Sequence, residues 1–313
     1  MKNNHQDLIQ VADLRQSILD EIFKDFTYPR KKWVRGLLEP LVWFSAHRFA
    51  SLAAKFDNTI TLHGFREALN EFLSPLVRGV DLDGYENIPE DGPLLIVSNH
   101  PGAVDSVAIG ANLPRDDLNV VATDFPLLKR LPSTSQRMIF IDPRAPTNIS
   151  GVRATINHLQ EGGAVLIFPS GRVEPDPAIL PHAREALQNW SPSIELFLRK
   201  VPETRVMVTI VSGVLAPIFL HNPLIRLWSG VRDPLMIAEV TQVVTQMILK
   251  KRFRMTPRIS FDFPRTVEEL HSDYGNFYLS ILAQASRLMM DHSITITKFP
   301  PITNLSPQEK MPL

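Results

Sequence analysis

Asp91–Leu113 reads DGPLLIVSNHPGAVDSVAIGANL, and the fold class of the chain follows from this one stretch. The triplet Asp91-Gly92-Pro93 is typical of a turn, and the apolar run Leu94–Val97 behind it predicts a short buried strand. A second turn signal, Pro101-Gly102, separates that strand from an apolar stretch at 104–113 that predicts a helix. A strand, a turn and a helix in direct succession are one unit of an α/β domain.

The same alternation continues along the chain. Further strands are predicted from short apolar runs at 118–122, 138–141, 164–168, 205–211 and 258–263. Helical stretches lie between them, near 147–161, 182–200 and 266–291. Thr266 and Glu269 have the spacing of a capping box at the start of the last helix. We therefore expect an α/β domain at 80–292, with a mixed, largely parallel sheet flanked by helices.

Three helical patterns precede this domain and predict an N-terminal helical subdomain at 1–79. One interpretation is that these helices pack on the main body. The alternative is contact with a membrane interface, through aromatic residues beside a basic cluster: Trp33, Trp43 and Phe44 with Arg30, Lys31, Lys32 and Arg35. The final residues, 293–313, are rich in proline and predict a loose C-terminal tail.

Composition excludes several classes of protein. The 313 residues contain 33 Lys and Arg against 33 Asp and Glu, and this neutral balance argues against a nucleic-acid binder that relies on its overall field. The absence of cysteine rules out disulfides, thiol nucleophiles, cysteine-based zinc sites and iron–sulfur clusters. The polar start, Met1–Asp7, predicts no secretory signal. The uncharged stretch 206–225 could span a bilayer, but its prolines and β-branched residues favour a buried strand followed by a loop.

His100 and Asp105 are the first candidate catalytic pair. On one continuous helix, residues five apart would point about 140° away from each other. The turn at Pro101-Gly102 instead places His100 at the strand exit and Asp105 in the first helical turn. There the carboxylate can accept the proton of one imidazole nitrogen and leave the other nitrogen free to take a proton from a hydroxyl. The alternative is an aspartate that caps the helix beside an incidental histidine.

Two strand-end arginines are candidate ligand-binding residues, because ligands of open α/β sheets bind at the carboxyl ends of strands. One predicted strand ends in Asp142-Pro143-Arg144. Another ends in Phe168-Pro169-Ser170-Gly171-Arg172. Guanidinium groups suit phosphate, since their forked donors match its oxygens. The alternative for both Arg144 and Arg172 is a surface ion pair.

Together these segments resemble the glycerolipid acyltransferase superfamily, whose best-known members are lysophosphatidate and glycerol-3-phosphate acyltransferases. His100 and Asp105 match its His-x4-Asp block. Ile139–Arg144 match the block in which a strand ends in a phosphate-binding arginine, and Phe168–Arg172 match in part the Phe-Pro-Glu-Gly block. Val208–Pro217 match a fourth, apolar block loosely, so that the resemblance spans roughly 80–265.

The resemblance implies a membrane-associated O-acyltransferase that needs no cofactor, metal or covalent enzyme intermediate. The acyl donor would be acyl-CoA or acyl-carrier protein, and the acceptor a lyso-phospholipid or glycerol-phosphate-type hydroxyl. His100 would be the general base, Asp105 would hold its imidazole, and amides around Gly102 would stabilise the oxyanion. Arg144 and the segment Phe168–Arg172 would bind the acceptor.

The chain departs from the family pattern at three points. Ser170 stands where the family has glutamate, and Glu174 is a potential substitute. Pro143 displaces the arginine of the second block to position 144, and Ser212-Gly213 stand where the fourth block has proline. These departures leave two other hypotheses open: a lipid hydrolase with Ser170 as nucleophile, and a non-catalytic lipid-binding homologue. The hydrolase has no Gly-x-Ser-x-Gly elbow to support it.

A basic stretch suggests where the protein acts. Five cations, Lys250, Lys251, Arg252, Arg254 and Arg258, lie in a part of the chain that has no acid between Glu239 and Asp262. Anionic lipid would attract such a patch, and the alternative is a solvated helix end favoured by the helix dipole. We expect a cytoplasmic protein that binds peripherally to the inner face of a membrane, with no nucleic-acid partner.

Overall fold

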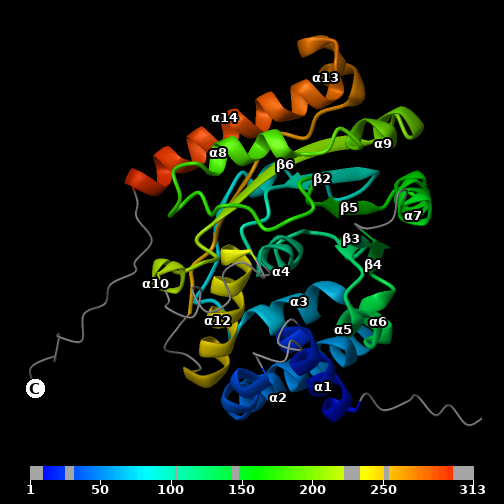
Figure 1. Cartoon of the computed structure of the whole chain (residues 1–313). Coiled ribbons are helices and arrows are strands. Elements are labelled where there is room, and N and C mark those ends of the chain that lie inside the picture. Colours follow the sequence, from blue (N-terminus) through cyan, green and yellow to red (C-terminus); the bar gives the residue numbers. More distant parts are fainter. Residues whose placement is uncertain are drawn as a thin grey trace, which may run out of the picture.

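A seven-stranded mixed sheet forms the centre of the described molecule (Figure 1). The computed structural model describes residues 10–24, 32–102, 104–142, 148–221, 233–249 and 254–298. The strands are β1 (Asp81–Asp83), β2 (Leu94–Ser98), β3 (Leu118–Thr123), β4 (Met138–Ile141), β5 (Ala164–Ile167), β6 (Arg205–Ser212) and β7 (Arg258–Phe261), in the spatial order β1-β7-β6-β2-β5-β3-β4. Neighbours pair in parallel except β6 with β7, which confirms the predicted mixed, largely parallel sheet.

All six predicted strands are present, and β1 is the one that the sequence did not reveal. Its sequence, Asp-Leu-Asp, is polar and largely exposed, so it lacks the apolar run by which the others were predicted. β2 lies at the centre, paired with β5 on one side and β6 on the other, and all five of its residues are buried. Burial of a strand on both faces explains its continuous apolar run.

Helices cover both faces of the sheet (Figure 1). On one face, Leu94 and Ile96 of β2 pack in a core shared with α3 (Phe65–Leu73), α4 (Val104–Ala111) and α12 (Pro234–Leu249). On the other face, Leu95 and Val97 pack in a second core. The helices of that second core include α7 (Ile149–Gln160), α9 (Ile194–Lys200) and α14 (Phe277–Lys298).

The N-terminal helices α1 (Val11–Phe23), α2 (Lys32–His63) and α3 confirm the three predicted helical patterns. They pack on the main body. Phe65 and Leu69 of α3 belong to the same core as the strands, and α2 hydrogen-bonds to α12 through Ser45 and Arg48. Shorter helices complete this side and the loops: η2 (Tyr85–Asn87), α5 (Pro126–Lys129), α6 (Pro132–Ser135) and α10 (Pro217–Leu220).

Three boundaries differ from those predicted. The stretch 182–200 is broken into α8 (Ala183–Ala186), η3 (Leu187–Asn189) and α9, because Pro192 lies between the last two elements. The stretch 266–291 is also two helices. Thr266 and Glu269 form the predicted capping box of α13 (Val267–Tyr274), and Gly275 ends that helix at a φ of 65°. α14 then continues to Lys298, so the tail predicted from 293 was placed too early.

Helix α12 was not predicted, because its sequence is rich in β-branched residues, which favour strands. The structure shows how two of them fit a helix. The hydroxyls of Thr241 and Thr245 each donate to the carbonyl four residues earlier, at a distance of 2.8 Å.

The uncharged stretch 206–225 forms most of the buried strand β6 and the short helix α10, as the strand interpretation predicted. Residues 222–232 lie outside the described residues. Among the helices that are described, none is both long enough and apolar enough to cross a membrane.

Candidate active site

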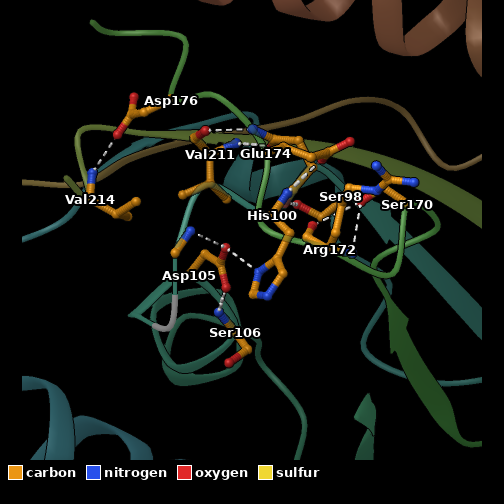
Figure 2. A network of polar contacts seen from close by, with 12 residues as sticks. Ser98, His100, Asp105, Ser106, Ser170, Arg172, Glu174, Asp176, Val211 and Val214 are labelled. Carbon is orange, nitrogen blue, oxygen red and sulfur yellow. Dashed lines mark hydrogen bonds and ion pairs between the residues drawn. The ribbon is translucent and has the colours of Figure 1, made fainter. Parts of the chain in front are cut away.

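The side chains of His100 and Asp105 touch at the turn between β2 and α4 (Figure 2). His100 Nδ1 lies 2.8 Å from Asp105 Oδ2. The main-chain N–H of Asp105 donates to the carbonyl of Gly102 at 3.2 Å, so the turn brings the first helical turn back toward the strand exit. The predicted contact is therefore present, and it lies at the carboxyl end of the central strand.

Asp105 is fully buried and held by its own helix N-terminus. Its Oδ1 accepts the N–H of Ser106 at 2.5 Å, and its Oδ2 accepts the N–H of Gly102 at 3.2 Å as well as the histidine contact. These donors and the positive end of the helix dipole stabilise a carboxylate. The Gly102 amide that we expected to face the oxyanion is thus engaged by Asp105 in this structure.

The imidazole of His100 is oriented from two sides. Because the carboxylate of Asp105 can only accept, the network assigns the hydrogen to Nδ1 and leaves Nε2 as an acceptor. Phe168 stacks on the ring with a centroid distance of 4.4 Å and an interplanar angle of 25°. The His100 side chain is 25% exposed, so the ring remains accessible. Phe168, which we expected to bind the acceptor, contacts the histidine itself.

Nearby carboxylates make His100 unusually basic. Burial of the ring alone would lower the pKa of His100, since it disfavours the imidazolium. The charge of Asp105 and its hydrogen bond oppose this effect, and so do the charges of Glu239 and Glu174. The carboxylates prevail and raise the pKa of His100 to about 9. The imidazolium that forms during proton transfer is accordingly well stabilised.

Glu174, which the sequence analysis named as a potential substitute for the family's glutamate, lies at the site. It is 3% exposed, and its Oε2 accepts the main-chain N–H of His100 at 2.8 Å. Its Oε1 accepts the indole N–H of Trp190 at 2.9 Å. Burial raises the pKa of Glu174 to about 7, although both hydrogen bonds favour the carboxylate. The side chain points inward, toward the catalytic turn.

The segment Phe168–Arg172 lies beside the catalytic turn because β5 pairs with β2. Ser170 Oγ donates to the carbonyl of Arg172 at 3.0 Å, and Pro169 accepts the N–H of Ser191 through its carbonyl at 3.1 Å. Within this local turn, Gly171 has a φ of 63°. The Arg172 side chain is exposed and makes no hydrogen bond or ion pair with another part of the chain that the structure describes. It is available to an external anion.

Arg144 lies outside the described residues, so its predicted convergence on the site stays a prediction. Its strand, β4, is the edge strand, and β5 and β3 lie between it and β2. Three strand spacings correspond to roughly 14 Å.

Two buried polar side chains connect the site to the end of β6, and neither was among the predicted site residues. Asn99 exchanges two hydrogen bonds with the main chain of Val211, at 2.9 and 2.8 Å. Asp176 accepts the N–H groups of Gly213, Val214 and Leu215, at 3.0, 3.0 and 3.2 Å. Figure 2 shows the contact with Val214. Both side chains hydrogen-bond to main-chain groups that lie at or beyond the end of the β6 strand pairing.

Glu239 reaches the site from α12, a segment far along the chain. A Cβ atom built on Gly102 would lie 3.6 Å from Glu239 Oε1 and 3.5 Å from Val214 Cγ2. Glu239 of α12 and Val214, which follows β6, therefore lie directly beside the catalytic turn. No local sequence signal predicts this approach, because α12 itself was not predicted.

Comparison with known proteins shows similarity to acyltransferases. Residues 79–202 match the family model described as Acyltransferase, and this segment contains His100, Asp105 and Phe168–Arg172. The 1-acyl-sn-glycerophosphate (LPA) acyltransferase PlsC from Thermotoga maritima is a similar solved structure, with 16% sequence identity and a TM-score of 0.42. That similarity covers 91% of this chain and 97% of PlsC. A search of curated proteins gave no match.

Proposed function

We propose that this chain is a glycerolipid acyltransferase that transfers a fatty acyl group to a lipid-type hydroxyl with His100 as general base, and the match of residues 79–202 to the Acyltransferase family model supports this proposal. The donor is a thioester, acyl-CoA or acyl-carrier protein. The acceptor is a lyso-phospholipid or a glycerol-phosphate-type molecule. One observation carries the proposal: the buried carboxylate of Asp105 lies 2.8 Å from Nδ1 of a partly exposed His100, whose other nitrogen can accept a proton.

The reaction needs one proton to move twice. Nε2 of His100 takes the proton of the acceptor hydroxyl while the oxygen attacks the thioester carbonyl. The tetrahedral intermediate then collapses, the C–S bond breaks, and the imidazolium returns the proton to the thiolate. An ester and a free thiol result, and the enzyme is unchanged. A positioned base of this kind supplies about 10²–10⁴-fold in rate, and alignment of the two substrates supplies much of the rest.

The direct test offers the purified protein a panel of lyso-lipids and glycerol phosphate, with radiolabelled acyl-CoA or acyl-carrier protein. We expect an esterified product with at least one acceptor, and none with the His100→Ala variant. Absence of product with every pair of donor and acceptor would contradict the proposal. So would an undiminished rate in His100→Ala.

Activity is expected to rise with pH. The base must be neutral, and a pKa of about 9 leaves only about one His100 in a hundred neutral at pH 7. We therefore expect kcat/KM to increase about tenfold per pH unit from pH 6 and to level off near pH 9. Initial rates across pH 6–10 measure this, with an NMR titration of the His100 ring alongside. A plateau reached already at pH 7 would show that the neighbouring carboxylates do not act as described.

Arg172 is expected to bind the anionic head group of the acceptor. Removing a charge-assisted contact at an exposed site costs about 1–2 kcal/mol, which corresponds to roughly tenfold in affinity. Arg172→Ala should therefore raise KM for a phosphorylated acceptor about tenfold and leave kcat within about twofold. Arg153→Ala, at an exposed arginine on α7, is the matched control and should change neither constant. An unchanged KM in Arg172→Ala would exclude the assignment.

The hydrolase hypothesis lacks its central contact. A serine nucleophile needs a hydrogen bond to its base, whereas Ser170 Oγ bonds to the Arg172 carbonyl and makes no hydrogen bond with His100, both residues being described. Labelling of Ser170 by a fluorophosphonate would nevertheless favour hydrolysis over acyl transfer. The third hypothesis, a decayed site, is disfavoured by the intact pairing of His100 with Asp105.

We also propose that the protein binds peripherally to a membrane through the surface where α2 meets α12. Trp43 and Phe44 are 43% and 50% exposed on α2, and Ile248 and Leu249 are exposed at the end of α12. Arg48 lies 5.2 Å from the Phe44 ring and donates to the Met247 carbonyl, which joins the two helix surfaces. Exposed aromatic residues beside cations are typical of an interfacial surface.

The structure describes the side chains of three of the predicted basic residues, Arg35, Arg254 and Arg258. Arg35 pairs with Asp20 and Glu39, and Arg258 is 13% exposed and lies 3.5 Å from Asp81. Arg254 is half-buried. Arg30, Lys31, Lys250, Lys251 and Arg252, and the side chains of Lys32 and Trp33, lie outside what the structure describes.

Vesicle flotation tests the membrane proposal. The Trp43→Ser, Phe44→Ser double variant should bind anionic vesicles at least tenfold more weakly than wild type at low salt, because each ring loses apolar burial worth about 1–2 kcal/mol. Leu62→Ser is the control, since Leu62 is 63% exposed near the other end of α2. Wild-type protein that stays in the soluble fraction would refute the proposal.

A further inference from the structure

Both main-chain polar groups of His100 bind the same residue. The N–H of His100 donates to Glu174 Oε2 at 2.8 Å, and the carbonyl of His100 accepts the N–H of Glu174 at 2.7 Å. The register of β2 with β6 ends at Ser98, so His100 lies beyond the sheet ladder and needs other partners. Glu174 supplies both and restrains the backbone from which the imidazole projects.

The carboxylate of Glu174 is itself held in place. Its second oxygen accepts the indole N–H of Trp190, which is 2% exposed and belongs to the core below the sheet-end loops. The hydroxyl of Tyr278 donates to the Trp190 carbonyl at 2.7 Å, which ties this tryptophan to α14. Each carboxylate oxygen of Glu174 therefore accepts a hydrogen bond from one N–H donor, the main chain of His100 or the indole of Trp190. Figure 2 shows Glu174 beside His100.

Burying a carboxylate is expensive, and an apolar side chain could fill the same space without that cost. Glu174 is nonetheless buried next to the reacting group, and its hydrogen bond goes to the main chain of the base. Ser170, which stands where the family has glutamate, hydrogen-bonds with Arg172 of its own turn, and its side chain also interacts with Glu174, which favours the carboxylate form of Glu174. The carboxylate of this loop thus reaches the site from four residues further along the chain.

We propose that Glu174 is a positioning residue for acyl transfer: its carboxylate and main-chain N–H clamp the backbone of His100, and Trp190 orients the carboxylate. The inference rests on the proposed function and deepens it. Glu174 touches no reacting atom in this role. It acts through the direction in which the imidazole points toward the acceptor hydroxyl.

A double-mutant cycle separates this role from a merely structural one. The side-chain amide of glutamine has one oxygen that accepts and one nitrogen that only donates. In Glu174→Gln, either the His100 N–H or the Trp190 indole N–H therefore loses its acceptor. Trp190→Phe removes the indole donor and lets the glutamine turn its oxygen to His100. We expect Glu174→Gln to lower kcat about 10- to 100-fold with KM within about twofold. In Glu174→Gln, Trp190→Phe, kcat should recover at least fivefold relative to Glu174→Gln.

Two further variants sharpen the cycle. Trp190→Phe alone should lower kcat, but less than Glu174→Gln does, because the carboxylate loses its orienting donor while the bond from His100 to Glu174 remains. Glu174→Asp keeps the charge but is one methylene shorter, so it should lower kcat while the pH profile stays close to that of wild type. Glu161→Gln, at an exposed glutamate before β5, is the matched control and should not differ from wild type.

The pH profile distinguishes the charge of Glu174 from its hydrogen bond. Because Glu174 helps to raise the pKa of His100, both variants with glutamine should reach their plateau at lower pH, whatever their kcat. NMR of the folded variants monitors the hydrogen bond between the His100 N–H and residue 174 and does not require enzymatic activity. The His100 amide resonance should move in Glu174→Gln and return toward its original position in the double variant.

The outcomes divide clearly. A double variant that stays as slow as Glu174→Gln, with an unrecovered His100 amide resonance, overturns the clamp. So does wild-type kcat in Glu174→Gln. If wild type shows no acyl transfer with any acceptor, the proposed function fails, and the NMR cycle alone then decides whether Glu174 positions His100. If Glu174→Gln does not fold, Glu174→Asp carries the test, and wild-type kcat in that variant refutes the proposal.

Discussion

Replacing His100 by alanine is expected to lower kcat at least a thousandfold while the protein remains folded. The variant loses an imidazole whose tautomer is fixed by Asp105 and whose other nitrogen is accessible, and general bases contribute about 10²–10⁴-fold. Loss of the imidazolium also removes stabilisation of the proton-transfer state. Single-turnover rates of product formation measure the effect, and His63→Ala, at an exposed histidine ending α2, is the control.

The stability of this variant should depend on pH in a defined direction. Folding raises the pKa of His100 from 6.5 to about 9, so its charged form stabilises the folded protein fully below pH 6.5 and not at all well above pH 9. The variant should therefore unfold at a lower temperature than wild type at pH 6, and the difference should shrink by pH 10. A kcat close to that of wild type would exclude His100 as the base.

Replacing Asp105 by asparagine is expected to lower kcat about 10²–10³-fold through the wrong tautomer. The Ser106 N–H makes the shorter bond, 2.5 Å to Oδ1 against 3.2 Å from the Gly102 N–H to Oδ2, so we expect the asparagine oxygen to accept from Ser106. The amide nitrogen then takes the place of Oδ2, faces His100 and leaves the Gly102 N–H without that acceptor. Nδ1 must then accept, the hydrogen moves to Nε2, and the ring can no longer take a proton from the acceptor. The geometry is otherwise preserved, so the loss is one of chemistry.

Nitrogen NMR of the His100 ring tests the mechanism of this loss directly. Wild type should show the Nδ1–H tautomer when neutral, and Asp105→Asn the Nε2–H tautomer. Asp91→Asn changes an exposed aspartate that precedes the first residue of β2, far from His100 along the strand. It serves as the control and should retain full activity. An unchanged tautomer together with unchanged kcat would show that Asp105 only caps α4.

The elements that could be predicted from the chain are those set by local patterns. Strands β2 to β7 are apolar runs bounded by turn residues, and α13 begins at a capping box whose two residues are three apart. The contact of His100 with Asp105 belongs to the same class, since a Pro-Gly turn joins them within six residues. Helix α12 could not be predicted, because its β-branched residues favour strands, whereas in the fold it packs against α2, α10 and the core of the sheet.

Local order along the chain is thus sufficient to place a histidine, an aspartate and an arginine at strand ends, because turns and short-range periodicity act over a few residues. Only the tertiary structure decides which strand ends are neighbours: β2 lies between β5 and β6, which brings Phe168 and Glu174 to His100. It also decides the basicity of the imidazole, since Glu174 and Glu239 arrive from 74 and 139 residues away. Burial and Coulomb interactions depend on distance in space, and no spacing in the sequence specifies them.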